Sequence, residues 1–515
     1  MRKNNFSTID KESSGAAQKT LLKEEFYRTF IMIAGRIPFW AVLPAGIDDR
    51  EYERWTTIAS TISTENYTPS DYIDLGNLPS ISGNECLGAL LWQTYKARND
   101  PVKSLIKGAL IANYYFFGSN ERLLCDEVKQ GYSKRQLDSY LLDPYTIVFE
   151  KVIKFFESIN DKEGLDLVKE CIILRLLGYP FAMELSASSP KQELLNRLVQ
   201  KWHWNERQLQ PLKSYKQWPE SKKLAYDGKI VNKLTYLYEL VLLSKDKKDK
   251  PFDMSLSDIR MLTNQISVWF QKKPNKIPKC STYIRARSND LLLTIACEPD
   301  TQHRHVWKVY ATVAEEKEPM SVLFIDSSLS RVVGWIVSQN LHGLKEAHIR
   351  FQQNATGLSL IKAKRFMRNA MEFFSATPSL PSKDPKWHQM MVALNGIAAN
   401  DYKTIESAEL LIKNTLGEIY FQPVNLSHIE KNLLKCYEVS LIMWRYIKTV
   451  PLFALMYRVE MLYVNTSYHA QKTIEDIIGK FRKKTISLDH KVSGRQPLLR
   501  ADKLNRLYQN RSAGI

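Results

Sequence analysis

A helix-start pattern recurs along the first half of the chain, with a polar residue directly before a proline and apolar residues after it. The pattern stands at Asp100-Pro101, Asp143-Pro144 and Ser189-Pro190. The polar side chain can accept a hydrogen bond from an early backbone amide, and a proline at the first helical position gives up no hydrogen bond. These starts predict a chain built mainly from packed helices over residues 20–273, although no common repeat relates the helices.

The stretch from Tyr72 to Lys107 holds two of these predicted helices in succession. Ser82 and Glu85 fit a capping box, in which the hydroxyl accepts from an early amide and the carboxylate reaches back to the amide of the serine. Apolar residues then fall on one face of each helix: Cys86, Leu87, Leu90 and Leu91 in the first, and Val102, Leu105, Ile106 and Ala109 in the second. This stretch is expected to be structural scaffold.

The first helix is expected to begin near Thr20 and to end at Gly35 and Pro38. Its apolar face is predicted from residues at helical spacing, namely Leu22, Phe26, Phe30 and Ile33. Residues 38–44 read as an apolar connector in extended conformation, because two prolines flank it. Asp48 and Asp49 then favour the start of another helix.

The pattern changes after Pro274. Apolar runs at 291–297, 306–313, 320–325, 347–352 and 390–394 predict strands. They alternate with predicted helices at 329–341 and 359–374. Beyond residue 400 a helix is expected at 429–446 and a strand at 461–464.

The predicted fold class is therefore a mostly α-helical N-terminal half followed by a smaller α+β region. Four parts are expected: a polar, disordered segment at 1–19, a helical domain at 20–275, an α+β domain at 280–398, and a mixed region with a basic tail at 399–515.

The net charge of +18 makes an anionic partner worth testing. The basic tail after residue 472 lacks the interleaved aromatic residues of single-strand binders, so a nucleic-acid partner is not expected. The six cysteines form no CxxC pair and mostly stand among apolar residues, which indicates buried free thiols. No apolar run approaches the ~18 residues of a membrane span, and the first residues lack the apolar core of a signal peptide. We expect a cytoplasmic protein without a membrane span.

Motifs for catalysis and metal binding are missing from the sequence. It contains no phosphate-binding glycine loop, no HExxH, no GxSxG and no GxGxxG. Nucleotidyl transfer uses paired carboxylates to hold divalent ions, yet the chain has no D-x-D. His303 and His305 are expected in a surface turn, and His203 at a helix end. No catalytic residue and no metal ligand is predicted.

Several segments, in order and with matching spacing, resemble the class I adenylate cyclases of enterobacteria. They are LLKEEFYRT at 21–29, YIDLGNL at 72–78, GALLWQTYK at 88–96, DPYTIVFEKV at 143–152, LDLVKECIILR at 165–175 and VQKWHW at 199–204. The resemblance is dense over residues 20–205, fainter to about 395, and patchy from 400 onward.

The resemblance implies a part of an enzyme that converts ATP to cyclic AMP and pyrophosphate with Mg²⁺. In that family a nucleotidyltransferase-like domain with a Gly-Ser strand and D-x-D precedes the region resembled here. The expectation is a chain without the catalytic domain, which a separately encoded partner would supply. The alternative is a non-catalytic helical interaction or regulatory protein derived from the family.

The resemblance also points to three residues for nucleotide binding. The helical domain after a nucleotidyltransferase domain often closes over the nucleotide, so Tyr27, Arg28 and Arg36 are candidates for a wall around the triphosphate. Guanidinium groups pair well with phosphate. The alternative is that Tyr27 and Arg28 only cap or pair with neighbouring helices.

Overall fold

A computed structural model gives the fold of most of the chain. It describes residues 19–61, 63, 68–78, 80–118, 122–134, 143–181, 185–186, 188–244, 256–288, 291–302, 304–313, 322–339, 348–352, 360–375, 386–396, 405–426, 428, 438–443, 456–461 and 476. The chain divides into two compact units: residues 1–385 with 413–421, and residues 386–412 with 422–515. Within the described residues, no helix combines the length and apolar character needed to cross a membrane.

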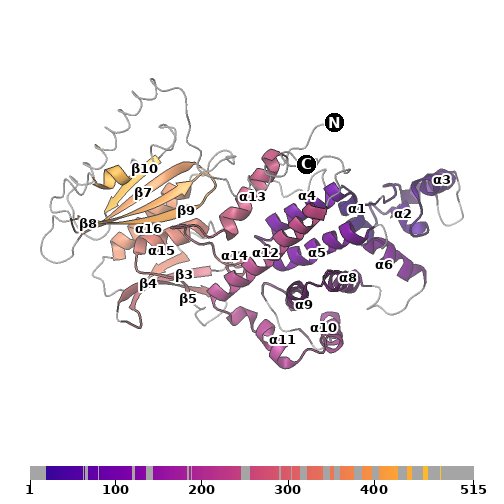
Figure 1. Cartoon of the computed structure of the whole chain (residues 1–515), viewed down its shortest axis with the longest axis horizontal. Helices are drawn as coiled ribbons and strands as arrows, with labels where there is room; N and C mark the ends of the chain where they lie inside the picture. The colour runs from indigo at the N-terminus through magenta and orange to yellow at the C-terminus, as the bar shows by residue number, and fades with distance from the viewer. Residues whose placement is uncertain are drawn as a thin grey trace, which may run out of the picture. The chain divides into compact units, whose positions relative to one another are not determined.

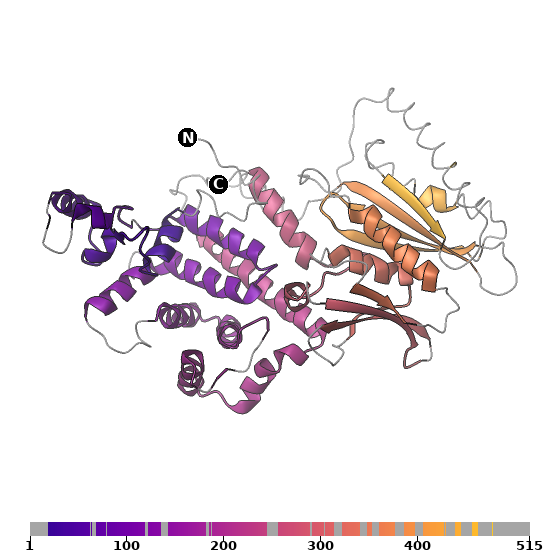
Figure 2. The same cartoon turned by 180° about the vertical axis from the view of Figure 1, so that it is seen from behind.

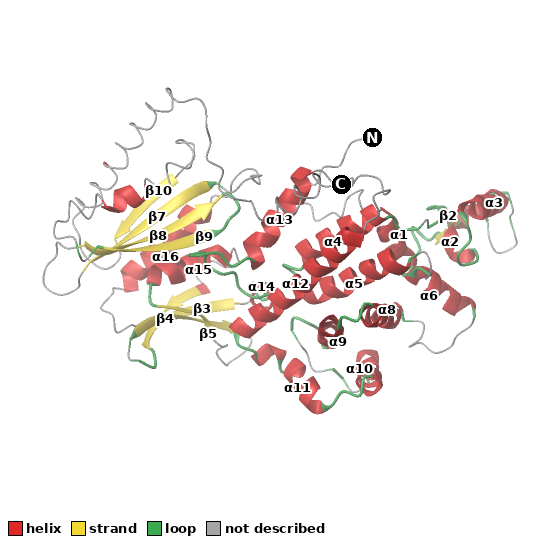
Figure 3. Cartoon of the chain, viewed as in Figure 1, coloured by secondary structure: helices red, strands yellow, loops and turns green. Residues whose placement is uncertain are grey.

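Helices fill the first half, and the larger sheets lie in the second (Figure 3), which confirms the predicted fold class. The helices are α1 (Lys19–Tyr27), α2 (Phe39–Val42), α3 (Asp49–Ala59), α4 (Gly83–Lys96), α5 (Pro101–Phe117), α6 (Leu124–Ser133), α8 (Pro144–Ser158), α9 (Lys162–Leu176), α10 (Pro190–Lys201), α11 (Glu206–Lys213), α12 (Glu220–Ser244), α13 (Leu256–Phe270) and α14 (Thr282–Ala286). The boundaries expected between the four parts remain predictions.

Helix α5 is the centre of the helical region and packs against α4, α8, α9 and α12 (Figures 1 and 2). Gly108 of α5 makes the approach to α12 possible, because a Cβ there would lie 2.5 Å from Leu234 Cδ2. The predicted helix starts are confirmed: Asp100, Asp143 and Ser189 each accept a hydrogen bond from an early amide of the helix they precede.

The capping box is only half formed. Ser82 Oγ accepts from the Glu85 amide as predicted. The Glu85 carboxylate accepts instead from the backbone amide of Leu21, at 2.7 Å. The Leu21 amide, which is distant in sequence, thus binds Glu85 in place of the Ser82 amide that a capping box would use.

Two predictions near the N-terminus are wrong. Helix α1 ends at Tyr27, and it buries Leu21, Glu24 and Tyr27 while Leu22 is 42% exposed. The buried face of α1 therefore differs from the predicted one, because Glu24 is buried with the Cys125 amide and Arg28 as its partners. The connector at 38–44 is mostly helical rather than extended, since Pro38 sits before α2, where proline is tolerated.

The α+β region contains a four-stranded sheet of order β5-β4-β3-β6. Strand β3 (Leu291–Pro299) pairs antiparallel with β4 (His305–Val313) and parallel with β6 (Ile349–Phe351), and β4 pairs antiparallel with β5 (Val322–Asp326). Helices α15 (Leu329–Gln339) and α16 (Leu360–Ser375) pack on each other, and Trp335 of α15 stacks on Phe324 of β5. These elements follow the predicted ones within a few residues.

A second sheet has the order β10-β7-β8-β9, and only part of it was predicted. Strand β7 (Trp387–Gly396) extends the predicted 390–394, whereas β8 (Ile405–Asn414) and β9 (Ile419–Asn425) were not foreseen. Strand β10 (Met456–Met461) precedes the expected strand at 461–464, whose other residues lie outside the described part. Residues 438–443 are helical, inside the helix expected at 429–446.

Candidate functional site

A small cleft of about 40 Å³ opens where α1 meets α4 and α5. This volume holds little more than one water molecule. Two cations and two carboxylates line the cleft together with mostly apolar residues. The full lining is Leu21, Leu22, Glu24, Glu25, Arg28, Ala89, Gln93, Lys107, Leu110, Ile111 and Tyr114. It is the candidate functional site because it contains Arg28 and combines residues far apart in sequence.

Glu24 forms the buried floor of this site and is only 1% exposed. Its carboxylate lies 3.5 Å from Arg28 and accepts a 3.2 Å hydrogen bond from the Cys125 amide of α6. Burial raises the pKa of Glu24, and the Arg28 charge and the Cys125 amide offset only part of that effect. Glu24 therefore joins α1 to α6.

Glu25 and Lys107 form an ion pair at the mouth of the cleft. Arg28 lies 3.9 Å from the same carboxylate. Burial opposes ionisation of Glu25, but Lys107 and Arg28 outweigh it, so the pKa of this carboxyl lies below its ordinary value. The sequence interpretation missed Glu25 and Lys107, because their positions 82 residues apart give no local signal.

The three predicted wall residues have different surroundings. Tyr27 is 1% exposed, stacks on Trp40 at 4.4 Å and donates a 2.6 Å hydrogen bond to the Gly76 carbonyl. Arg28 is directed at Glu24 and Glu25, with 13% of its side chain exposed. Arg36 is exposed in the turn that follows α1. Tyr27 is the last residue of α1 and Arg28 follows it directly, and the polar groups of both already have partners. Triphosphate binding by the three residues stays a prediction.

A second polar cluster joins α12 to the start of α14. Glu220 accepts hydrogen bonds from the amide and hydroxyl of Ser281, at 2.5 and 2.8 Å. Asp227 accepts from the amide and hydroxyl of Thr282, both at 3.0 Å, and from the Tyr179 hydroxyl at 3.2 Å. Burial raises the pKa of Glu220 to about 7, although the two Ser281 hydrogen bonds oppose the shift. Both carboxylates therefore accept hydrogen bonds from the residues at the start of α14.

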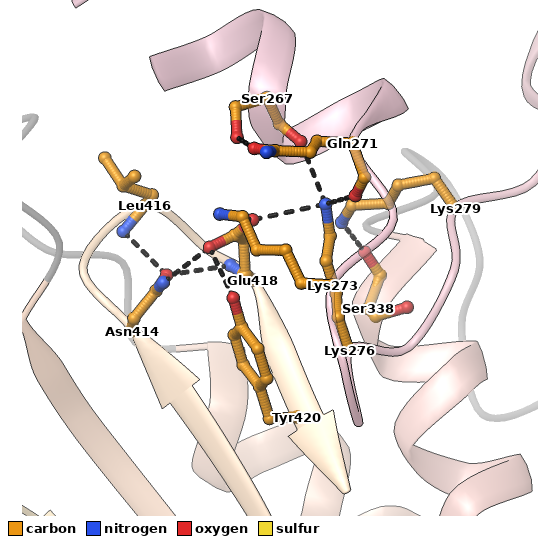
Figure 4. Close-up of polar contacts among 10 residues, drawn as sticks. All are labelled: Ser267, Gln271, Lys273, Lys276, Lys279, Ser338, Asn414, Leu416, Glu418 and Tyr420. Carbon is orange, nitrogen blue, oxygen red and sulfur yellow. Dashed lines mark hydrogen bonds and ion pairs between the residues drawn. The ribbon is translucent and has the colours of Figure 1, made fainter. Parts of the chain in front are cut away.

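A third cluster surrounds Glu418 in the turn between β8 and β9 (Figure 4). Its carboxylate lies 2.8 Å from Lys273 Nζ and 3.2 Å from Lys276 Nζ. The same carboxylate accepts from the Asn414 amide at 2.8 Å and the Tyr420 hydroxyl at 3.0 Å. Burial opposes the charge on Glu418, but Lys273, Lys276 and Asn414 outweigh it, so the pKa of this carboxyl lies below its ordinary value.

Backbone pairing accompanies this third cluster. Ile277 donates to the Ile419 carbonyl and Phe421 to the Asn275 carbonyl, both at 2.8 Å. The segment after α13 is therefore joined to the start of β9 by an isolated antiparallel bridge between Lys276 and Tyr420, and the Glu418 cluster lies beside this bridge.

The histidine, cysteine and acidic side chains are the candidates for a metal site or a reactive nucleophile. Within the described residues, no group of three or more His, Cys, Asp or Glu side chains could hold a metal ion. His203 occupies a left-handed position two residues after α10 ends and His305 begins β4, while His303 lies outside the described part. The described cysteines are buried free thiols, and burial raises the pKa of each.

Comparison with known proteins relates the cleft to two family segments. Residues 81–281 match the family model described as adenylate cyclase, class I, second domain, and residues 1–41 match that of the adenylate cyclase NT domain. Helix α1 lies in the segment that matches the NT-domain model, and α4 and α5 lie in the segment that matches the second-domain model. The cleft lies where these two segments pack together.

Curated relatives named adenylate cyclase give the same result. The protein of Escherichia coli K12 is 27% identical over 390 residues, which is 75% of this chain and 45% of the relative. That of Salmonella typhimurium is 28% identical over 338 residues, 65% and 39% respectively, and that of Yersinia intermedia 25% over 394 residues, 75% and 45%. The chain spans less than half the length of these relatives, and no solved structure matches it. The chain is therefore a relative of the class I adenylate cyclases.

Proposed function

We propose that this chain is the part of a class I adenylate cyclase that follows the catalytic nucleotidyltransferase domain. It supports the conversion of ATP to cyclic AMP and pyrophosphate when such a domain is joined or bound to it. One observation carries the proposal: the NT-domain match at 1–41 and the second-domain match at 81–281 pack against each other around the α1 cleft. The curated relatives bear the name of this activity.

The described part of the chain does not fit Mg²⁺. Its buried carboxylates at positions 24, 220, 227 and 418 already accept hydrogen bonds from amides, hydroxyls or ammonium groups. Magnesium requires several oxygen ligands in near-octahedral order. The sequence has no D-x-D pair either. The metal-binding carboxylates therefore belong to the nucleotidyltransferase domain in this proposal, and no step through the metal is assigned to this chain.

The role left to this chain is to position the nucleotide and support the catalytic domain. Arg36 is exposed, and its side chain forms no ion pair with another residue that the structure describes, so it is free of such a contact when it meets phosphate. Arg28 and Tyr27 would have to exchange existing contacts with Glu24 and Gly76. Of the three proposed wall residues, Arg36 is therefore the main candidate for phosphate binding.

An assay of cyclic AMP formation tests the proposal. The purified chain with Mg-ATP should give no product, and adding the separately produced NT domain of the Escherichia coli K12 adenylate cyclase should increase the product above that of the domain alone. The matched control is the same domain with its D-x-D aspartates changed to asparagine. Abundant product from this chain alone would contradict the assignment of catalysis to another domain.

A second function, a non-catalytic interaction or regulatory protein, is favoured by the internal pairing of the cleft. Glu24, Glu25, Arg28 and Lys107 already neutralise one another. This function predicts no gain in cyclic AMP on mixing with the catalytic domain. The DNA before the Met1 codon is a further discriminator, because an encoded catalytic domain there favours the first function.

A further inference from the structure

Large apolar side chains are exposed on the segment around α1, α2 and α3. The described residues expose thirteen such side chains, and six of them lie between residues 22 and 55: Leu22, Ile31, Met32, Ile33, Val42 and Trp55. Ile31 and Met32 are 57% and 58% exposed. Ile31, Met32 and Ile33 are consecutive in the chain and together form an exposed apolar group. Grouped exposed apolar residues mark interaction sites, whereas single ones need no explanation.

A tight turn holds the most exposed of these residues in place. Ile33 and Arg36 exchange both backbone hydrogen bonds, at 3.0 and 2.9 Å. Ala34 and Gly35 between them have φ values of 50° and 77°, as in a two-residue type I′ hairpin turn. We name residues 30–36 the apolar hairpin.

Aromatic packing anchors the base of the apolar hairpin. The Phe30 ring lies 5.9 Å from Trp40 and 5.2 Å from Tyr132 of α6. Trp40 in turn stacks on the buried Tyr27. The hairpin therefore presents Ile31, Met32 and Ile33 from a fixed base, and a partner need not order a loose loop to bind them.

We propose that the apolar hairpin is the docking surface for the nucleotidyltransferase domain of a class I adenylate cyclase. The occupant follows from the family matches: the hairpin lies in the segment that matches the NT-domain model, and only residues 1–41 of this chain match it. The curated relatives are more than twice as long as the part matched. The apolar hairpin has an exposed apolar face with the exposed Arg36 at its edge, and such a face is suited to contact with a folded protein domain. This inference rests on the proposed function and adds the surface through which it works.

A binding measurement tests the docking surface. The full chain and its I31S/M32S variant are titrated with the NT domain of the Escherichia coli K12 adenylate cyclase in a calorimeter. The variant is expected to bind at least ten-fold more weakly. The matched control is Ile361→Ser on α16, a side chain that is 79% exposed in another part of the fold, and its affinity should not change. Thermal unfolding of all three proteins checks that each is folded.

The outcomes separate this inference from the function on which it rests. If the wild-type chain binds the domain and increases cyclic AMP formation while I31S/M32S binds equally well, the docking surface is wrong and the function stands. If the wild-type chain does not bind the domain, both are overturned. Self-association of the chain that is lost in I31S/M32S, with unchanged binding of the domain, would assign the surface to a second copy and also overturn the inference.

Discussion

The backbone amide of Leu21 donates a 2.7 Å hydrogen bond to the carboxylate of Glu85. This bond connects the segment that matches the NT-domain family model to the first helix of the second-domain match. Glu24 makes a comparable connection to α6 through the Cys125 amide. Helix α1 is therefore held by carboxylates at both of these contacts.

Glu85→Ala should lower the free energy of unfolding by about 1–2 kcal/mol, because the Leu21 amide loses its acceptor and α4 loses a charge near its N-terminus. Urea unfolding measures the change. The control is Glu193→Ala, in the first turn of α10, whose only described contact is an exposed pair with Arg197. That change should cost about 0.3–0.5 kcal/mol. Equal effects would contradict a tertiary role for Glu85.

Gly108→Ala and Gly228→Ala should have opposite effects on stability. A Cβ at Gly108 would meet Leu234, so the α5–α12 contact must shift at a cost of about 1–3 kcal/mol. Among the described residues, no atom outside the adjoining backbone of α12 lies within 4 Å of a Cβ at Gly228, and alanine should stabilise the helix by about 0.5–1 kcal/mol. Thermal unfolding of the two variants checks the signs. A stabilised Gly108→Ala would contradict the close packing.

Glu418→Gln should destabilise the chain by about 3–5 kcal/mol, since it leaves Lys276 buried without a counter-charge. The side chain of Lys276 is only 5% exposed. The exposed pair of Glu206 with Lys213 gives the control, Glu206→Gln, which should change stability by less than about 1 kcal/mol. The pKa of Glu418 is lowered on folding, so its contribution is present above the unfolded value of about 4.3 and is lost as the pH falls. The wild type and Glu418→Gln should therefore converge in acid.

Glu220→Gln should change the pH dependence of stability in the opposite direction. Folding raises the pKa of Glu220 to about 7, whereas a glutamate in the unfolded chain has a pKa of about 4.3. Between these two pH values the folded state therefore binds more protons than the unfolded state. Its contribution to stability therefore decreases as the pH rises through this window. Urea unfolding between pH 5 and 8 should show a decline for the wild type that is shallower in Glu220→Gln. Parallel profiles would contradict the raised pKa.

Arg36→Ala and Arg28→Ala separate nucleotide binding from folding. Arg36 is exposed, so its loss should leave thermal stability unchanged and raise the KM for ATP of the assembled cyclase severalfold. Arg28→Ala should lower stability by about 1–3 kcal/mol, because it leaves Glu24 buried without its cation. An unchanged KM for Arg36→Ala would contradict the proposed wall.

Local chemistry explains the parts of the fold that were predicted well. Asp100, Asp143 and Ser189 cap helices through bonds that span two or three residues, so a short sequence window contains the whole interaction. The strands β3 and β4 were likewise predicted from two apolar runs that flank a polar turn. Strand β8 was missed because its buried residues include the consecutive Leu410, Leu411 and Ile412, which do not alternate with polar ones.

The candidate site depended on contacts that no short window contains. Of the cleft, the sequence identified Arg28 through the family resemblance, but not the Glu25–Lys107 ion pair beside it. It predicted the capping role of Ser82 and missed the partner of Glu85 in α1.

The helix starts, the change from helical to α+β structure and the kinship with class I adenylate cyclases could all be predicted from the amino-acid sequence. Which charged residues are buried, and which groups they bind, depends on the folded chain. Glu220 meets Ser281 across 61 residues, and Glu418 meets Lys273 across 145. A carboxylate can be buried only where such partners replace its water, and the fold alone brings those partners together.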